Sequence, residues 1–382
     1  MAVDALAGFL AKPAVRNAPP HDAPITTMVR TSFLFVMPPG IDSVGLPPNA
    51  KIAPQRALTT MVQSSTTPID ADVAKVKKLW GDTEGTWRTE ELTHWTQHPK
   101  VRDRINRLIS GNPQIDRFQY FIQRHLRRRL PVQRALTLGC GHGELERGLL
   151  KYNLAKVHEG VDISDGAVAE AARLSAGNSS RLRYRVSDLN SITLPRFQYD
   201  VVFGVMSIHH VAALEHLFEE VCAALKPNGY FFLDEFVGPN QFQWSDPQLD
   251  AINDEIALMP ERFKQCVEDR SIIKGEVPRW TIDEMNCMEP SEAIRSSDIL
   301  PLLSKYFEVV EVKGYGGSIL HMLLDHIAGN FAEDVPDAMY YLECLFHMED
   351  HLLELGTIRH DFAVVIARRK TTFRTWIDFY SR

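Results

Sequence analysis

The chain has 382 residues and a net charge of −7, with a hydrophobic fraction of 45% and a charged fraction of 24%. This length fits one large α/β domain with additions or two smaller domains, and the negative charge argues against a protein that mainly grips a polyanion. The five scattered cysteines form no CxxC pair, which indicates reduced thiols rather than a disulfide framework or a zinc site (Cys140, Cys222, Cys266, Cys287 and Cys344).

The first 130 residues divide into two parts by composition. Residues 1–70 are rich in proline, alanine and threonine, which interrupts helices and strand pairing and predicts an irregular arm. Residues 71–130 show helical periodicity at 71–80, 90–110 and 116–130, and the last of these helices is ended by Pro131. We expect this helical segment to cover one side of the domain that follows.

Residues 131–382 alternate strand and helix in the manner of stacked βαβ units. The run YDVVFGVMS is continuously apolar, as a strand buried on both faces should be. The alternation is interrupted between residues 239 and 297 and then resumes. Strands are predicted at 135–139, 156–164, 181–190, 199–207, 230–238, 308–316 and 361–369. The pattern predicts an α/β fold whose seven-stranded, mostly parallel sheet has helices on both faces.

The strongest chemical signal is the glycine-rich run LGCGHG at residues 138–143, between a predicted strand and a helix. Glycines let backbone amides approach a ligand closely and tolerate positive φ. Asp162 ends the second predicted strand, where an acid can bind ribose hydroxyls, and Asp188 ends the third. Either acid alone could be a strand-end cap, but together with the glycine run they become predicted ligands.

These three features resemble those of the class I, Rossmann-like S-adenosylmethionine-dependent methyltransferases that act on small molecules. In that family the loop runs beside the methionine part of the cofactor, the first acid binds the ribose and the second pairs with the adenine amino group. YDVVFGVMSIHHV resembles the family's fourth strand and its following loop, and LKPNGYFFLDE resembles the entry to the fifth. The resemblance covers about residues 134–237 and implies S-adenosylmethionine as cofactor, with S-adenosylhomocysteine as product. The cofactor-binding residues that it implies are Gly139, Cys140, Gly141, Gly143, Asp162, Ile163, Asp188, Leu189, Val205 and Met206.

A competing interpretation of the glycine run is a nicotinamide or flavin site. A dinucleotide needs its pyrophosphate at a helix N-terminus, with the third glycine three positions after the second. Here Gly143 lies two positions after Gly141, and the helix opens with Glu144 and Glu146. Carboxylates there would repel a pyrophosphate but tolerate a cationic sulfonium, which favours S-adenosylmethionine. A glycine turn without any ligand is the third interpretation.

The candidates for the reacting end follow the fourth and fifth predicted strands. His209 and His210 lie where open α/β sheets bind ligands, and a histidine can accept a proton from a hydroxyl. The pair could equally cap the next helix, and the sequence does not separate the two residues. Glu235 ends the fifth strand beside Asp234, and one of these two should face the site. The predicted catalytic residues are therefore His209, His210 and Glu235.

The interruption at residues 239–297 lies where the resembled family usually builds a lid over its substrate. Candidate residues in this insertion, or after the sixth strand, are Trp244, Arg262, Trp280, Arg295 and His321. Arg295 would suit a carboxylate or phosphate on the substrate. The sequence shows neither the Asn/Asp-Pro-Pro-aromatic motif of amino-methylating nucleobase enzymes nor the acid cluster of magnesium-dependent catechol enzymes. We therefore expect a methyltransferase without a metal, acting on a small molecule.

The predicted function is O-methylation of a hydroxyl or carboxyl group on a secondary metabolite, lipid or sugar, with N-methylation less favoured. The alternatives are a catalytically silent Rossmann-like binding scaffold and a methyltransferase for protein or RNA. One basic run could touch nucleic acid, but a solvated helix end fits the acidic chain better (Arg124, Arg127, Arg128, Arg129 and Arg134). We expect no nucleic acid partner, no membrane span and a cytoplasmic location, and a homodimer is left open.

Overall fold

The computed structural model describes residues 92–370, so the predicted arm at 1–70 and the predicted helix at 71–80 lie outside the described residues. Seven strands form one sheet in the order β3-β2-β1-β4-β5-β7-β6. The strands are β1 (Val132–Leu138), β2 (Ala155–Asp162), β3 (Leu182–Val186), β4 (Tyr199–Val205), β5 (Leu225–Phe236), β6 (Phe307–Gly314) and β7 (Phe362–Arg369). Only β7 runs antiparallel to its neighbours, β5 and β6. The predicted seven-stranded, mostly parallel sheet of a Rossmann-like fold is confirmed.

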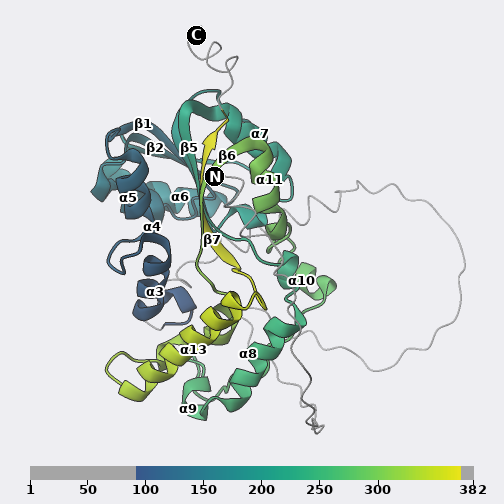
Figure 1. Cartoon of the computed structure of the whole chain (residues 1–382). Helices are drawn as coiled ribbons and strands as arrows, with labels where there is room; N and C mark the ends of the chain where they lie inside the picture. Colours follow the sequence, from purple (N-terminus) through teal and green to yellow (C-terminus); the bar gives the residue numbers. More distant parts are fainter. Residues whose placement is uncertain (1–91, 371–382) are drawn as a thin grey trace, which may run out of the picture. The chain divides into compact units, whose positions relative to one another are not determined.

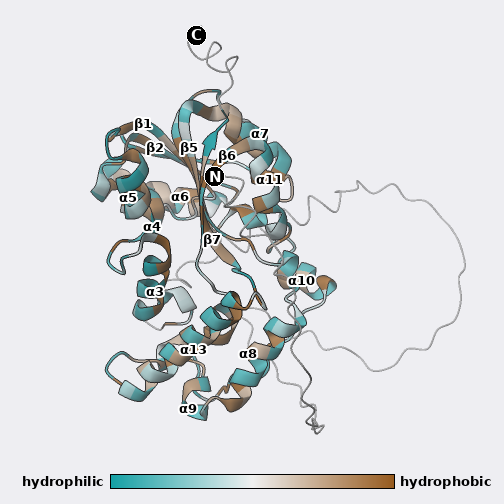
Figure 2. Ribbon diagram, viewed as in Figure 1, coloured by the Kyte–Doolittle hydropathy of each residue, from teal (hydrophilic) through white to brown (hydrophobic). Residues whose placement is uncertain are grey.

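Both faces of the sheet are buried, because neighbouring residues of its strands pack into two different apolar clusters. Phe231 and Leu233 of β5 belong to one cluster, whereas Phe232 between them belongs to the other. The helices that connect the strands are α5 (Glu144–Leu149), α6 (Asp165–Leu174), α7 (Leu214–Ala224) and α11 (Ile299–Tyr306), with the short turns η4 (Leu150–Tyr152), η5 (Ala176–Asn178) and η6 (Ile208–His210). These helices carry polar and apolar residues side by side (Figure 2), as amphipathic helices packed on a sheet do.

Helical elements that precede β1 cover one face of the sheet. They are η2 (Trp95–Gln97), α3 (Pro99–Ser110), α4 (Arg117–Phe121) and the π-helical turn η3 (Ile122–Leu126). The Phe121 ring lies 5.1 Å from that of Phe232 in β5. α3 ends at Gly111, whose φ of 81° is the left-handed value that favours glycine at a helix C-terminus. The helix predicted over 116–130 is shorter than expected, because its last turn closes at Leu126.

The segment between β5 and β6 and the segment between β6 and β7 are mainly helical. They contain η7 (Asn240–Phe242), α8 (Asp246–Leu258), α9 (Glu261–Lys264), α10 (Ile282–Met288), η8 (Ser296–Asp298), α12 (Leu320–Leu324), η9 (Ala328–Asn330) and α13 (Pro336–Glu354). α12 packs against α8, α13 and η2, so helices from three parts of the chain come together. In Figure 1 the antiparallel β7 points up, so the parallel strands end toward α8 and α13.

This arrangement places the segments that follow β1, β2, β4 and β5 at one edge of the sheet, facing these helices. Ligands of open α/β sheets bind at that edge, outside the carboxyl ends of the strands. Within residues 92–370, no helix combines the length and the apolar character needed to cross a bilayer.

Candidate active site

The glycine loop follows β1 and has the backbone shape that requires glycine. Gly139, Gly141 and Gly143 all have positive φ, at 67°, 48° and 76°. A Cβ on Gly139 would lie only 2.4 Å from the Cβ of Ser207, and one on Gly143 would lie 2.6 Å from the Tyr184 hydroxyl. These two positions therefore need glycine for space as well as for conformation. The loop is narrow and closely packed, with its backbone at the carboxyl edge of the sheet.

Asp162, at the end of β2, is turned toward the glycine loop. Its Oδ2 accepts a hydrogen bond from the Gly141 amide at 2.9 Å, and its Oδ1 accepts one from the Ser164 amide at 2.9 Å. Ser164 in turn caps α6, as its hydroxyl accepts from the Ala167 amide. The carboxylate thus joins the loop after β1 to the loop after β2 while its side chain stays partly exposed. This is the placement predicted for an acid that binds a ribose beside the loop.

The loop after β4 closes the other side of the glycine loop. The Ser207 hydroxyl donates to the Leu138 carbonyl at 2.7 Å. Met206, directly before it, has a φ of 50°, a left-handed value that is costly for a non-glycine residue, and its side chain is 41% exposed. An apolar side chain held outward at such a point fits a contact with a bound ligand. Val205, before it, is partly buried.

Asp188 and Asn190 form the turn after β3. Asp188 Oδ1 accepts from the Asn190 amide at 2.8 Å and from the Asn190 side chain at 3.0 Å. Asn190 Oδ1 accepts from the amides of Ala212 and Ala213, which precede α7. Asp188 is therefore held at the same edge as Asp162, and the turn that carries it is tied to the segment after β4. Leu189, between the two polar residues, is 9% exposed.

Two residues at the glycine loop are more buried than the sequence suggests. The Cys140 side chain is buried against Gly160, its amide donates to the Val161 carbonyl, and burial raises the pKa of its thiol. Any contact of Cys140 with a cofactor would therefore come from its backbone rather than from its thiol, and the contact stays a prediction. Glu146 is fully buried, and burial raises its pKa to about 7. Its carboxylate therefore does not face the ligand, and of the two predicted glutamates only Glu144 lies at the surface.

Glu235 is fully buried at the end of β5 and gathers three donors. It accepts hydrogen bonds from the amides of Ser207 and Ile208, at 3.0 and 2.9 Å, and lies 2.7 Å from Nδ1 of His209. The carboxylate therefore fixes both the start of η6 and the orientation of the His209 ring. This geometry gives Glu235 a positioning role rather than direct contact with a substrate. Sequence reasoning placed Glu235 near the site but could not foresee that it holds His209.

His210 lies beside His209, with 4.2 Å between the ring centroids. Its Nδ1 is 3.2 Å from Oε1 of Glu289 and 3.2 Å from the Ser291 hydroxyl. Burial alone would lower the pKa of His210, but Glu289, Glu292 and Glu235 outweigh this effect and raise that pKa to about 9. Glu289 and Glu292 come from the segment after α10, which no local sequence pattern connects with the histidines.

Asp234, next to Glu235, faces the other side of the sheet, as strand alternation requires. The Tyr315 hydroxyl donates to its Oδ1 at 2.7 Å, and Arg117 forms an ion pair with its Oδ2. Burial raises the pKa of Asp234, and Arg117 opposes that shift. This triad ties the N-terminal α4 and the end of β6 to the tip of β5.

Of the candidate lid residues, the aromatic ones lie around Phe242 and Gln243, whereas the two arginines are paired elsewhere. Trp244 is 2% exposed and stacks on Phe242, and Arg262 pairs with Asp337 at the surface. The Arg295 guanidinium is already bonded to Glu215, at 2.6 and 2.8 Å, and to Asp298. His321 lies in an aromatic cluster, where burial lowers its pKa to about 3. The Trp280 carbonyl accepts a hydrogen bond from Gln243. The lid function of this segment stays a prediction.

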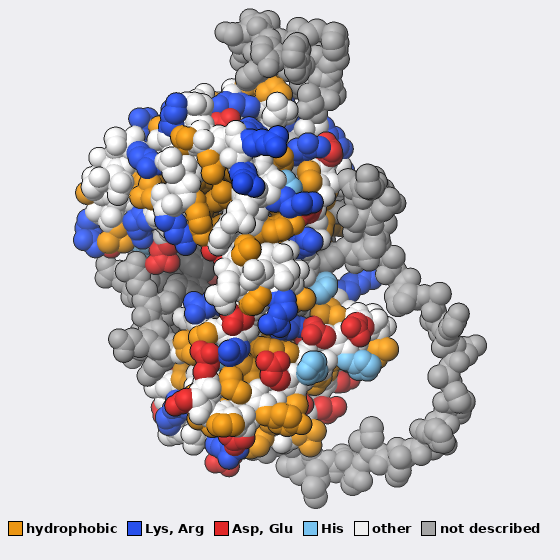
Figure 3. Space-filling view, turned by 60° about the vertical axis from the view of Figure 1, so that its left-hand side comes forward, with side chains coloured by type: hydrophobic (Ala, Val, Ile, Leu, Met, Phe, Trp, Pro, Cys, Tyr) orange, Lys and Arg blue, Asp and Glu red, His pale blue; other side chains and the backbone are white. Residues whose placement is uncertain are grey.

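The predicted basic run is partly neutralised by carboxylates of the same chain. Arg124 bonds Glu311 at 3.1 Å, and Arg129 and Arg134 lie 3.6 Å from Asp200 and Glu159. On the face shown in Figure 3, Lys and Arg side chains are dispersed over the upper part, with apolar side chains between them. These pairings support the interpretation of the run as a solvated helix end.

Residues 136–233 match the family described as "Methyltransferase domain". They span β1 to β5 and include the glycine loop, Asp162, Asp188 and the two histidines. The chain carries a class I methyltransferase domain. The predicted family is confirmed, and S-adenosylmethionine is the cofactor of that family. The strand order β3-β2-β1-β4-β5-β7-β6 establishes the fold.

The chain is also similar to individual methyltransferases. It is 27% identical over 130 residues to a sterol 24-C-methyltransferase of Gibberella zeae, which covers 34% of each chain. It is 25% identical to the 27-O-demethylrifamycin SV methyltransferase of Amycolatopsis mediterranei, over 44% of this chain and 56% of that one. A solved S-adenosylmethionine dependent methyltransferase from Mesorhizobium loti has 18% identity and a TM-score of 0.35, and covers 63% of this chain and 93% of that one. The chain spans about a third of the length of the sterol methyltransferases that it matches.

Proposed function

We propose that the chain transfers a methyl group from S-adenosylmethionine to a hydroxyl oxygen of a small molecule. The observation that carries this proposal is the hydrogen bond from the Gly141 amide to the Asp162 carboxylate, within a methyltransferase domain. Asp162 would bind the ribose hydroxyls, Asp188 the adenine amino group, and the glycine loop the methionine part. Ile163, Leu189, Val205 and Met206 would supply the apolar walls around the adenine and the sulfonium.

The hydroxyl acceptor is supported by the charges around the two histidines. Glu235, Glu289 and Glu292 all lie within ion-pairing distance of His209 or His210. This concentration of negative charge would repel a carboxylate substrate but tolerate a neutral hydroxyl. We therefore favour a hydroxyl over the carboxyl group that the sequence left open. The similar proteins include enzymes named for O-methylation and for C-methylation, so an experiment must identify the methylated atom.

We assign His209, His210 and the glutamates around them to the binding of the acceptor molecule. His209 and His210 lie two and three residues after Ser207, which packs on Gly139 of the glycine loop. Methyl transfer from a sulfonium is an in-line displacement, so the acceptor oxygen must lie beyond the methyl group and lose its proton. His209 or a glutamate of this cluster would accept the proton, whereas His210, with a pKa of about 9, already carries one at neutral pH. An RNA substrate has no comparable support, because Arg124, Arg129 and Arg134 already pair with carboxylates of the same chain.

Calorimetry with S-adenosylmethionine tests the cofactor part of the proposal. Asp162→Asn should weaken binding about 10- to 100-fold, since a charge-assisted hydrogen bond of about 1.5–3 kcal/mol is lost. Asp165→Asn is the matched control, because Asp165 is an exposed acid in the first turn of α6, and its affinity should stay within about twofold of the wild type. Equal affinities for both variants and the wild type would reject the assigned site.

The reaction is tested by the release of S-adenosylhomocysteine. The full chain is incubated with S-adenosylmethionine and either a pooled metabolite extract or total RNA. Product that forms with the metabolites and disappears when their hydroxyl groups are acetylated supports O-methylation. Product that forms only with RNA would contradict the small-molecule proposal, and no product with either would leave the scaffold interpretation as the better one.

A further inference from the structure

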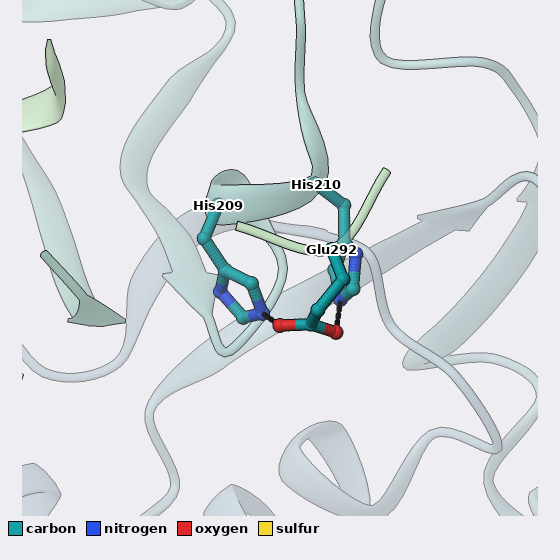
Figure 4. Close-up of side chains that lie close together, drawn as sticks. All are labelled: His209, His210 and Glu292. Carbon is teal, nitrogen blue, oxygen red and sulfur yellow. Dashed lines mark ion pairs between the residues drawn. The ribbon is translucent and has the colours of Figure 1, made fainter. Parts of the chain in front are cut away.

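Within residues 92–370, one group of histidine and acidic side chains is arranged as metal ligands commonly are: His209, His210 and Glu292. One ligand atom from each residue lies within 4.8 Å of the other two. Figure 4 shows the Glu292 carboxylate between the two rings, with one oxygen toward each. Nε2 of His209 is 3.7 Å from Oε1 of Glu292, and Nε2 of His210 is 3.8 Å from Oε2.

The other nitrogen of each ring is held by a further carboxylate. Nδ1 of His209 lies 2.7 Å from Glu235, and Nδ1 of His210 lies 3.2 Å from Glu289. A carboxylate accepts the ring N–H, which leaves the lone pair of Nε2 pointing into the cluster. Proteins orient metal-ligating histidines in this way, with a carboxylate behind the ring. Two independent rings with this arrangement, facing the same third ligand, are hard to explain by helix capping alone.

The separations inside the cluster also fit a shared ion better than direct hydrogen bonds. Distances of 3.7 and 3.8 Å exceed the range of an N–H···O hydrogen bond. An ion bound at about 2.0–2.2 Å places neighbouring ligand atoms roughly 3.3–3.5 Å apart in a tetrahedral site. The two histidine–glutamate separations therefore exceed this spacing by only a few tenths of an ångström. Two lone pairs and a carboxylate would repel one another, so a positive charge is needed between them, either a bound ion or a proton on one of the rings.

We propose that His209, His210 and Glu292 bind a divalent first-row transition metal ion, with Zn²⁺ as the probe. Two imidazoles and one carboxylate suit such ions, and three protein ligands leave a position open for a water or substrate oxygen. His210 and Glu292 are 16% and 19% exposed, so the cluster is not sealed from solvent. The proposal differs from the metal-free enzyme expected from the sequence. Its competitor is a protonated histidine network without any ion.

The role of the ion rests on the proposed function. An acceptor hydroxyl bound at the open position becomes more acidic and releases its proton to solvent. Its oxygen lone pair then forms the bond to the methyl carbon, while the electrons of the broken carbon–sulfur bond return to sulfur. The cationic sulfonium becomes the neutral thioether of S-adenosylhomocysteine. Atoms and charge balance without a further reactant.

Zinc calorimetry on the chelator-treated full chain tests the site, together with visible absorption of the Co²⁺-substituted protein. The wild type should bind one ion per chain, and Co²⁺ should give the intense absorption of a tetrahedral site. Glu292→Ala, which removes a ligand, should lower zinc affinity at least about 100-fold. Glu289→Gln, which only weakens the support of His210, should lower it about 10-fold. Glu292 is preferred over His209 as the target because it is less buried.

His326 provides a matched control. It also lies between two acidic side chains, Glu268 at 2.6 Å and Asp325 at 3.5 Å, but its side chain is 45% exposed. His326→Ala should leave zinc binding unchanged. Absence of stoichiometric zinc uptake by the wild type would overturn the proposal, and so would equal losses in the Glu292 and His326 variants.

Binding of S-adenosylmethionine separates this inference from the proposed function. Glu292→Ala should lose zinc but keep its cofactor affinity within about threefold, because the ion pairs of the Glu292 carboxylate within residues 92–370 are to His209 and His210. A wild type that binds cofactor but no zinc refutes the metal site and leaves the proposed function standing. A wild type that binds zinc but no cofactor refutes the proposed function and the role of the ion in it.

Discussion

The two ends of the candidate site are assembled in different ways. The glycine end consists of short turns that each follow a strand directly, with Asp162 bonded to the Gly141 amide. The histidine end combines η6, the tip of β5 and the segment after α10, three parts of the chain that are far apart in sequence. The difference shows that a binding loop can be encoded locally, whereas a reacting group depends on the tertiary fold. Substitutions at each end should therefore have different consequences.

The largest effect is expected at the glycine end. Gly139→Ala places a Cβ 2.4 Å from Ser207 at a φ of 67°, so the loop must shift. We expect the affinity for S-adenosylmethionine, measured by calorimetry, to fall at least about 100-fold, or about 2.7 kcal/mol. Gly148→Ala is the control, because Gly148 lies within α5 with no atom near its added Cβ. That change should stabilise the helix by up to about 1 kcal/mol and leave affinity intact. Similar losses of cofactor affinity in both variants would show that the shape of the glycine loop does not determine the binding of S-adenosylmethionine.

The same contrast explains how much could be predicted from the sequence. The strands were predictable because apolar runs alternate with amphipathic helices, and Asp162 was predictable because it follows the second run at a fixed spacing. Glu292 was not, because it lies in an irregular segment whose position depends on how α10 packs. Arg295 was predicted to face a substrate, but it is paired with Glu215 and Asp298, which only the tertiary structure reveals. Sequence patterns record periodic burial and local turns, not side-chain pairings between distant loops.

Beneath the glycine loop, Glu146 should make stability depend on pH. Burial raises its pKa from 4.5 to about 7, although Thr137 and the backbone amide of Glu146 oppose that shift. A raised carboxyl pKa gives stability that is complete below the unfolded value and lost as pH rises through the folded value. Glu146→Gln removes this pH-dependent loss of stability, because the amide does not ionise.

The free energy of unfolding of the Gln variant relative to the wild type should therefore increase by about 3 kcal/mol between pH 4.5 and pH 7 and then level off. Denaturant titrations at several pH values measure it. A difference that stays constant over this range would show that Glu146 keeps an ordinary pKa.

At the histidine end, Glu235→Gln tests the positioning of His209. The amide keeps one acceptor oxygen but presents N–H groups to donors, so we expect a loss of about 2 kcal/mol in unfolding free energy. The His209 ring should then accept at Nδ1 and carry its proton on Nε2, a change of tautomer that nitrogen NMR detects. Methyl transfer should fall more than cofactor affinity does.

Glu308→Gln is the matched control, because Glu308 is 50% exposed and its pairing with Arg368 is worth little. An unchanged His209 tautomer in the Glu235 variant would mean that Glu235 supports the fold without orienting the ring.

The smallest effect is expected at Arg295, and it separates pairing within the chain from substrate recognition. The guanidinium bonds Glu215 and Asp298 at the surface, where such networks contribute at most about 1 kcal/mol. Arg295→Ala should therefore lower the unfolding free energy by about 0.5–1 kcal/mol and leave KM within about twofold of the wild type. Because Arg295 lowers the pKa of Glu215 from 4.5 to about 2, the small loss should shrink as pH falls below 4.5 and vanish near pH 2, where Glu215 is protonated even when it is paired. A tenfold rise in KM would instead show that Arg295 leaves its partners to bind an anionic group of the substrate. The segment after β5 would then contribute a residue to substrate binding.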